Sequence, residues 1–244
     1  MTKTSQPTQS SHRIVSHEEW LQARAAHLSQ EKEFTRLRDE LTVARRALPW
    51  EHVTKNYVFD GPLGKKTLAE LFDGRSQLIV YHFMFAPDWD AGCKSCSFWA
   101  DNFNGIPVHL KHRDVTFIAV SRAPSSKLHA YAARMKWSFP WYSSYGNDFN
   151  FDYFVSFTPE QQAARKAYYN YAEREIPTSD LVGISVFYRD DGDNVFHTYS
   201  TYSRGVDMLN GAYHYLDLTP KGRDEANQGP NPQAWVRRHD EYDL

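Results

Sequence analysis

Two cysteines, and no others, occur in this chain of 244 residues, and they lie three positions apart in Cys93-Lys94-Ser95-Cys96. On the first turn of a helix, residues at this spacing share a face, and their Cβ atoms lie about 5 to 6 Å apart. A modest adjustment then gives the geometry of a disulfide. The pair follows the apolar run Leu78 to Phe85, which is typical of a central strand covered on both faces. A buried strand that leads into a dithiol on a helix restricts the fold strongly.

The segments around the dithiol alternate between strand and helix patterns. A second buried strand is expected from Val115 to Ser121, followed by a helix from Ala123 to Trp137 behind the start signals Pro124 and Ser125. The other expected elements are a strand and hairpin from Tyr57 to Gly64, a short helix from Leu68 to Phe72 capped by Thr67, a helical stripe from Cys93 to Leu110 that Gly105-Ile106-Pro107 kinks or splits, a helix from Pro159 to Glu175, a hairpin of Ile184 to Tyr188 with Val195 to Tyr199, a final helix near Val206 to Tyr215, and an anchor at Trp235 and Val236.

In chain order, these elements predict an α/β fold: a thioredoxin-like three-layer α/β/α sandwich with a mixed central sheet, an N-terminal helical extension and an insertion before the C-terminal hairpin. Residues 1–15 are expected to be a disordered tail. Residues 16–50 form the helical extension, which a capping box of Ser16 and Glu19 begins. The thioredoxin-like domain is expected over 51–226, with its insertion at about 138–182, and residues 227–244 form a tail.

Long motifs in the chain resemble those of domain of unknown function family 899, over about Trp20 to Tyr242. The motifs are Asp60-Gly61-Pro62, Tyr81-His82-Phe83-Met84-Phe85, the stretch from Cys93 to Gly105, Val120-Ser121-Arg122-Ala123-Pro124, the stretch from His197 to Tyr202, and the stretch from Tyr215 to Arg223. The resemblance implies a thioredoxin-like fold and the activity of a dithiol-disulfide oxidoreductase.

Within the dithiol, Cys93 is the candidate nucleophile, because the N-terminus of a helix lowers the pKa of a thiol. Cys96, one turn deeper, is the candidate resolving cysteine. Lys94 adds positive potential, and Asp88 and Asp90 oppose it if they lie near. The alternative is a pair of buried helix cysteines without chemistry.

Two further residues are weaker candidates for supporting the thiolate or the substrate. Arg122 follows a buried strand and is expected in the loop beside the dithiol. There it stabilises a thiolate or binds a carboxylate of the substrate, or, as the alternative, it forms a structural salt bridge. Trp89 lies in the approach loop, where we expect it to be exposed. The other large aromatic residues near the site, Trp99, Trp141 and Tyr142, are interpreted as core.

Two departures from thioredoxins keep other functions open. Of the tryptophan and glycine that thioredoxins hold before the first cysteine, only the glycine remains, as Gly92, and Ala91 takes the place of the tryptophan. No proline directly precedes the strand that begins at Ile184, where thioredoxins place a cis proline. A peroxiredoxin-like thiol peroxidase is one alternative, although Asp90 stands where peroxiredoxins hold a threonine. A non-catalytic thioredoxin-fold binding module is the other.

The composition of the chain restricts the classes of binding partner. The formal net charge of -2 argues against nucleic acid and acidic membranes. The N-terminal residues lack the apolar run of a signal peptide, and no apolar run approaches the roughly 20 residues of a membrane helix. We therefore expect a cytoplasmic protein that acts on a disulfide-containing protein or a small thiol, with a homo-oligomer possible and no cofactor. Zinc binding by the two cysteines with His109 and His112 is disfavoured, because a continuous helix would separate the two pairs by about 20 Å.

Overall fold

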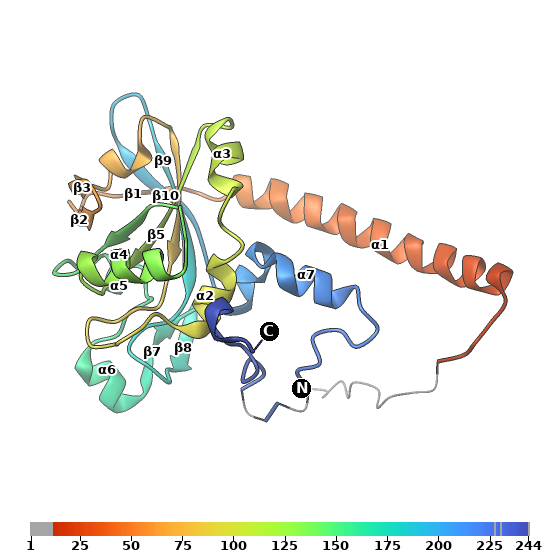
Figure 1. The fold of residues 1–244 in the computed structure, drawn as a ribbon. Coiled ribbons are helices and arrows are strands. Elements are labelled where there is room, and N and C mark those ends of the chain that lie inside the picture. The colour runs from red at the N-terminus through yellow and green to blue at the C-terminus, as the bar shows by residue number, and fades with distance from the viewer. Residues whose placement is uncertain (1–11, 227, 230, 244) are drawn as a thin grey trace. The chain divides into compact units, whose positions relative to one another are not determined.

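The computed structural model describes residues 12–226, 228–229 and 231–243 (Figure 1). Contacts divide the chain into two compact units, Met1–Pro49 and Trp50–Leu244. The expected disorder of residues 1–15 falls largely on residues 1–11, which lie outside the described residues. Among the described residues, no helix combines the length and the apolar character needed to span a bilayer.

The first unit holds one long helix, α1 (His17–Arg46). The expected capping box is present: the Glu19 N–H donates to the Ser16 side chain, and the Ser16 N–H donates to the Glu19 carboxylate at 3.0 Å. Arg45 and Arg46 occupy the last turn, where positive charge stabilises a helix C-terminus. No residue of α1 is buried.

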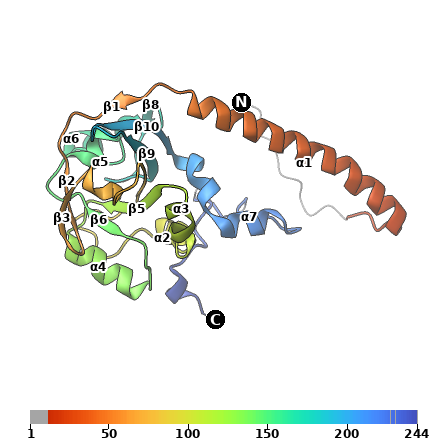
Figure 2. The same ribbon diagram turned by 90° about the horizontal axis from the view of Figure 1, so that it is seen from above.

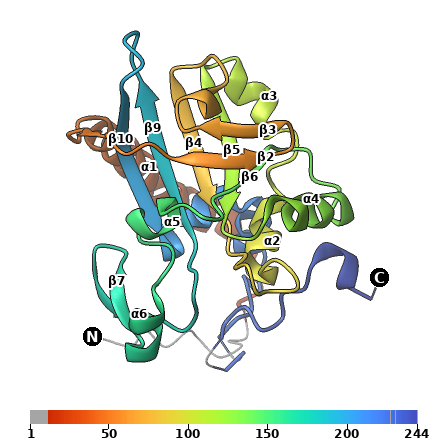
Figure 3. The same cartoon turned by 90° about the vertical axis from the view of Figure 1, so that its left-hand side faces the viewer.

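The second unit is built on an eight-stranded mixed sheet (Figure 3). Across the sheet, the strands follow in the order β1 (Glu51–His52), β10 (Val195–Tyr202), β9 (Gly183–Arg189), β4 (Gln77–His82), β5 (Val115–Ser121), β6 (Trp141–Ser143), β2 (Val58–Gly61) and β3 (Gly64–Thr67). Strands β4 and β5 are parallel, with Tyr81 opposite Ala119. Strand β9 is antiparallel to β4, and β10 is antiparallel to β9.

Two helices connect β4 to β5. The expected helical stripe is split into α2 (Lys94–Ala100) and α3 (Ile106–Lys111) (Figure 2). Gly105, directly before α3, has a φ of 83°, a conformation that favours glycine. Helix α4 (Ser125–Arg134) leads from β5 to β6. After the β9–β10 hairpin come a 3₁₀ helix, η2 (Ser203–Leu209), and α7 (Gly211–Asp217). A parallel pair joined through a helix, next to an antiparallel hairpin and a helix, is the thioredoxin-like plan, so the predicted fold class is confirmed.

Side chains on alternate positions of the central strands face two different cores. On one face, Tyr81 and Phe83 pack with residues of α2, α4 and α7, among them Trp99, Tyr131 and Tyr213. On the other face, the core is formed by residues of β4, β5, the 3₁₀ helix η1 (Glu70–Phe72) and α5 (Phe149–Asp152). The sheet is therefore covered on both faces, as the apolar run in β4 predicts.

The segment between β6 and β9 differs from the sequence prediction. The single helix expected from Pro159 to Glu175 is wrong: α6 (Pro159–Ala164) ends at Arg165, and β7 (Lys166–Tyr169) pairs with β8 (Ala172–Glu175). Asn170 and Tyr171 both have positive φ values, the conformation of a two-residue hairpin turn. In addition, residues 141–143, which fall in the expected insertion, form β6 of the main sheet.

The C-terminal segment packs against the core. Val236 is fully buried, and the Trp235 ring contacts the Phe98 ring at 5.5 Å between centroids. The anchor predicted at these two residues is confirmed. The final helix expected near Val206 to Tyr215 is instead two elements, η2 and α7, because Asn210 ends the first and caps the second by accepting the Tyr213 N–H.

Candidate functional site

The two cysteines lie where the chain leaves β4 and enters α2. Cys93 is the N-cap residue of α2, and Cys96 lies in the first turn. The Cys93 N–H donates to the Met84 carbonyl at 3.1 Å, and the Met84 N–H donates to the Cys96 sulfur at 3.5 Å. These bonds fix the dithiol against the end of β4. Both thiols are free.

Gly92 is required directly before the dithiol. A Cβ at this position would lie 2.7 Å from a Phe83 ring carbon and 3.0 Å from a Tyr131 ring carbon, both in the core. Only glycine leaves room for these rings. The requirement for glycine at position 92 is therefore one of packing.

The surroundings of Cys93 favour its thiolate. The Cys96 thiol donates a hydrogen bond to the Cys93 sulfur, which is the largest cause of the shift in the Cys93 pKa. The backbone N–H groups of Cys96 and Ser95 and the charge of Arg238 act in the same direction, whereas burial acts against them. The pKa of Cys93 is lowered to about 6. Unpaired N–H groups are the usual source of positive potential at a helix start. Cys93 therefore carries a nucleophile at neutral pH.

Cys96 has the opposite character. Its side chain is only 2% exposed, and burial raises its pKa, as do its hydrogen bond to Cys93 and the negative charge there. Cys96 is therefore held as a thiol while Cys93 is a thiolate.

Arg238 reaches the dithiol from the C-terminal segment. Its Nη2 donates to the Gly92 carbonyl at 2.8 Å, and its Nε donates to the Tyr131 hydroxyl at 2.6 Å. The Tyr131 hydroxyl also lies 2.9 Å from the Ser97 hydroxyl in α2. Sequence analysis missed Arg238, because nothing in a charged tail indicates which of its arginines meets a site 145 residues earlier.

Arg122 lies in the loop after β5, as expected, and its guanidinium is bound to a carboxylate. Its Nε and Nη2 donate to Asp180 at 2.8 and 2.6 Å, and the Asp180 side chain is 3% exposed. Ser156 and Ser179 donate to the same carboxylate. Of the two roles left open for Arg122, this geometry is that of the structural salt bridge.

Lys94 and Trp89, the other weak candidates, flank the dithiol in sequence. Lys94 opens α2 and is half-buried. Trp89 is also half-buried, less exposed than expected, because it packs against the core cluster that contains Cys96. The Lys127 ammonium donates to the Trp89 and Pro87 carbonyls and so fixes the approach loop.

Val182 occupies the position directly before β9. Among the described residues no peptide bond is cis. The Val182 carbonyl accepts a hydrogen bond from the Tyr169 hydroxyl of β7 at 2.7 Å. A residue of the β7–β8 hairpin thus holds the loop opposite the dithiol.

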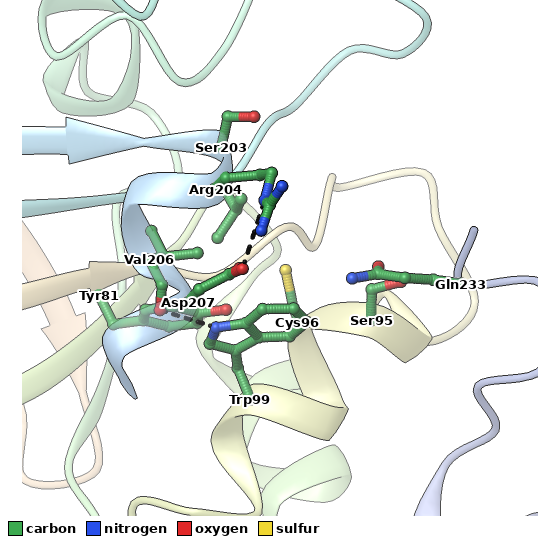
Figure 4. A pocket seen from close by; sticks show the side chains of 10 residues that line it. Tyr81, Ser95, Cys96, Trp99, Ser203, Arg204, Val206, Asp207 and Gln233 are labelled. Atoms are coloured by element: carbon green, nitrogen blue, oxygen red, sulfur yellow. Dashed lines mark hydrogen bonds and ion pairs between the residues drawn. The ribbon is translucent and has the colours of Figure 1, made fainter. Parts of the chain in front are cut away.

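A cavity of about 200 Å³ opens beside Cys96 (Figure 4). We call it the Cys96 cavity; its lining residues are Tyr81, Ser95, Cys96, Trp99, Val182, Ser203, Arg204, Val206, Asp207 and Gln233. The Trp99 indole N–H donates to the Val206 carbonyl at 2.9 Å and fixes one wall. Sequence analysis did not find this cavity, because its walls come from five separate segments of the chain.

A second polar cluster crosses the sheet on its other face. The Nε2 of buried His82 lies 2.8 Å from the Ser185 hydroxyl, which lies 2.8 Å from the Ser200 hydroxyl, which lies 2.7 Å from the Nε2 of His197. His197 Nδ1 meets Glu51 at 3.3 Å. Burial, and the nearby His197, lower the pKa of His82 to about 3, so its ring is neutral.

His109 and His112, considered as zinc ligands, lie in α3 and at its C-terminus. The described residues contain no group of three or more histidine, cysteine, aspartate or glutamate side chains arranged to hold a metal ion.

Comparison with known proteins gives one sequence family. A model for a "Bacterial protein of unknown function (DUF899)" matches residues 9–242, which confirms the resemblance stated from the motifs. No curated protein matches the chain.

Several solved structures are similar to this one. Peroxiredoxin 6 of Arenicola marina has 13% sequence identity and a TM-score of 0.44, with 72% of this chain and 77% of that chain covered. Peroxidoxin BcpB from Mycobacterium tuberculosis has 14% identity and a TM-score of 0.40, with 66% and 93% covered. A yeast mitochondrial 1-Cys peroxiredoxin has 16% identity and a TM-score of 0.41, with 70% and 78% covered.

Proposed function

The chain belongs to DUF899, a bacterial protein family of unknown function, and from its dithiol we propose that it is a thiol-disulfide oxidoreductase. Cys93 is the nucleophile and Cys96 the resolving cysteine. The substrate class is a disulfide, carried either by a protein or by a small molecule. Lys94, Trp89 and Arg122 are weaker candidates for supporting the substrate or the thiolate.

The observation that carries this proposal is the opposite acidity of the two cysteines. Cys93, with its pKa lowered to about 6, is ionised at neutral pH, and Cys96, with its pKa raised, is not. A dithiol reductant needs this division, because one sulfur attacks while the other waits to resolve the mixed disulfide. Two structural cysteines in a core would both be shifted toward the thiol by burial.

The reaction transfers two electrons from the protein to the substrate. The Cys93 thiolate attacks one sulfur of the substrate disulfide, and the other sulfur leaves as a thiolate. Cys96 then loses its proton and attacks the Cys93 sulfur, which expels the second substrate thiolate and forms the Cys93–Cys96 disulfide. The Cys96 hydrogen bond to Cys93 keeps the two sulfurs adjacent for this second step.

Trapping of the mixed disulfide tests the assignment. The Cys96→Ser variant is incubated with a disulfide-bonded protein substrate, and covalent complexes are counted on non-reducing gels. We expect covalent complexes through Cys93 that dithiothreitol reduces, and no such complexes with the matched variant Cys93→Ser. If the wild-type dithiol forms no internal disulfide in any glutathione buffer, the protein is not an oxidoreductase of this kind, and noncovalent binding by a thioredoxin-fold module becomes the better account.

A thiol peroxidase is the second candidate, because an ionised Cys93 beside the Arg238 charge also suits attack on a hydroperoxide. In that reaction, the Cys93 thiolate attacks the terminal oxygen of the hydroperoxide, the O–O bond breaks, and an alcohol or water leaves as Cys93 becomes a sulfenic acid. Cys96 then condenses with the sulfenic acid to form the Cys93–Cys96 disulfide and release water. Stopped-flow oxidation by hydrogen peroxide distinguishes the candidates. A peroxidase oxidises far faster than free cysteine does, whereas an oxidoreductase specific for disulfides shows no such advantage.

A further inference from the structure

The Cys96 cavity gives access to the sulfur that the proposed function treats as the second to react. Figure 4 shows the Cys96 side chain directed into the cavity, between the side chains of Arg204 and Gln233. Cys93, although only half-buried, is not among the described residues that line it. A small molecule in this cavity therefore meets Cys96, and not the nucleophile of the proposed reaction.

Tyr81 stands beside Cys96 at the same cavity. Its side chain is fully buried. Burial raises the pKa of Tyr81, and the charge of the Cys96 sulfur and a hydrogen bond to that sulfur raise this pKa further. Tyr81 therefore adjoins the Cys96 sulfur but exposes no hydroxyl to a molecule in the cavity.

Arg204 places a cation at the cavity wall. Its side chain is 86% exposed and meets Asp207 only at 3.5 Å. Asp207 already has a closer partner, Arg223, at 3.1 Å. The exposed Arg204 guanidinium can therefore bind an incoming carboxylate through its planar fork in addition to Asp207.

Resting on the proposed function, we propose that the Cys96 cavity binds a small thiol that carries a carboxylate, and that this thiol re-reduces the Cys93–Cys96 disulfide by attacking the Cys96 sulfur. Its size fits this class, because a cavity of about 200 Å³ is smaller than the sites that hold drug-sized ligands. Arg204 binds the carboxylate.

The chemistry favours entry at Cys96. A thiolate that attacks the Cys96 sulfur breaks the Cys93–Cys96 bond and expels the Cys93 thiolate, leaving the small thiol in disulfide linkage with Cys96. Thiol exchange is faster when the leaving thiol has the lower pKa, and here that thiol is Cys93. A second small thiol then attacks the bound one, releases a small disulfide and leaves Cys96, which takes up a proton. Two small thiols lose two electrons in total, and the protein dithiol gains them.

The sulfur that is attacked can be identified directly. The protein is oxidised to its internal disulfide, mixed with mercaptoacetate, quenched in acid within milliseconds, alkylated and digested. Trypsin cuts after Lys94 and so separates the two cysteines into different peptides. We expect mercaptoacetate on the Cys96 peptide and the alkyl group on the Cys93 peptide.

The reverse distribution, with mercaptoacetate on Cys93, overturns the inference but leaves the oxidoreductase intact. Failure to form the internal disulfide at all removes the proposed function and this inference together. The two failures are therefore distinguishable in one experiment.

Rates of reduction test the binding groups. Mercaptoacetate and 2-mercaptoethanol are of similar size, and only the first carries a carboxylate. In Arg204→Gln we expect reduction by mercaptoacetate to slow about fivefold, the effect of losing one exposed ion pair, with no change for 2-mercaptoethanol.

The control variant Arg113→Gln makes the same charge change at an exposed position before β5 and leaves both rates as in the wild type. An equal loss for the two thiols in Arg204→Gln, or an equal loss in Arg113→Gln, contradicts the assignment of Arg204.

Discussion

Cys93 and Cys96 show how strongly position within one helical turn determines thiol chemistry. At the N-cap of α2, Cys93 meets N–H groups that have no partner within the helix. Cys96, three residues later, faces the core and loses its hydration. The two shifts have opposite signs, although both cysteines belong to the same short segment.

The acidity of Cys93 leads to the first prediction. Because the Cys96 thiol is the largest of the groups that lower the Cys93 pKa, the Cys96→Ala variant should raise it from about 6 toward its ordinary value. The pH dependence of iodoacetamide alkylation, followed by mass spectrometry, measures both midpoints. A wild-type midpoint near 8.5 would show that Cys93 is not activated.

Arg122 carries the second prediction. In Arg122→Met, the nearly buried Asp180 carboxylate loses its charge partner, so we expect a loss of about 3 kcal/mol in the free energy of unfolding. Urea titration checks this value. The double variant with Asp180→Asn should recover part of the loss, because no buried charge is then left unpaired. If Arg122→Met unfolds like the wild type but loses activity, Arg122 serves the substrate instead.

Single residues also mark the limit of sequence analysis. The cysteine pair, the missing proline and the approach loop were readable from local patterns. Arg238 and Arg204 were not, because their roles come from contacts between segments that only the folded topology brings together.

At the scale of elements, sequence analysis predicted the central strands and failed in the region after β6. The run in β4 is apolar on both faces, and such a pattern has few alternatives. The segment from Lys166 to Glu175 forms a hairpin of two strands. Its polar residues and two adjacent tyrosines obscure the alternation of apolar and polar residues that is typical of a strand. The turn residue Asn170 is an asparagine, a residue type that tolerates the positive φ it has in the structure, and this residue type is the turn signal in the sequence.

Strands β4, β9 and β10 also share the buried chain from His82 to His197. A neutral His82 that carries its proton on Nε2 donates to the Ser185 hydroxyl. Ser185 then donates to the Ser200 hydroxyl, and Ser200 donates to His197 Nε2. This arrangement leaves only an acceptor, His82 Nδ1, without a partner among the described residues. A hydrogen-bond chain thus ties the three strands on the face opposite the dithiol.

The third prediction follows from the neutral state of His82. Its folded pKa of about 3 lies below the ordinary value of 6.5, so between these pH values only the unfolded chain takes up the proton. Stability is full above pH 6.5 and falls on acidification, by about 1.4 kcal/mol per pH unit for one proton. In His82→Gln, which does not titrate, the slope of unfolding free energy against pH should be smaller by this amount. Equal slopes in the two proteins would mean that His82 is charged in the fold.

At the scale of the whole molecule, the two units differ in how they are stabilised. The three hydrophobic clusters lie in the second unit, from Val53 onward. In α1, large apolar side chains such as Trp20, Phe34 and Leu41 are exposed, and the helix relies on its capping box and ion pairs such as Arg24 with Glu31.

This contrast gives the fourth prediction. A chain that begins at Trp50 should melt within about 2 °C of the full protein, because α1 contains no buried residue. The matched control ends at Ala234 and so lacks fully buried Val236, and it should melt several degrees lower. Calorimetry compares the three proteins. A large loss on removing residues 1–49 would show that α1 supports the second unit.

Arg238 stands 145 residues after Cys93, yet its guanidinium is bound to the carbonyl directly before that cysteine. On the ribosome, Cys93 therefore emerges long before one of the charges that acidify it has been translated. The Arg238 charge can therefore act on Cys93 only after the segment that carries it has been translated and has docked against Gly92.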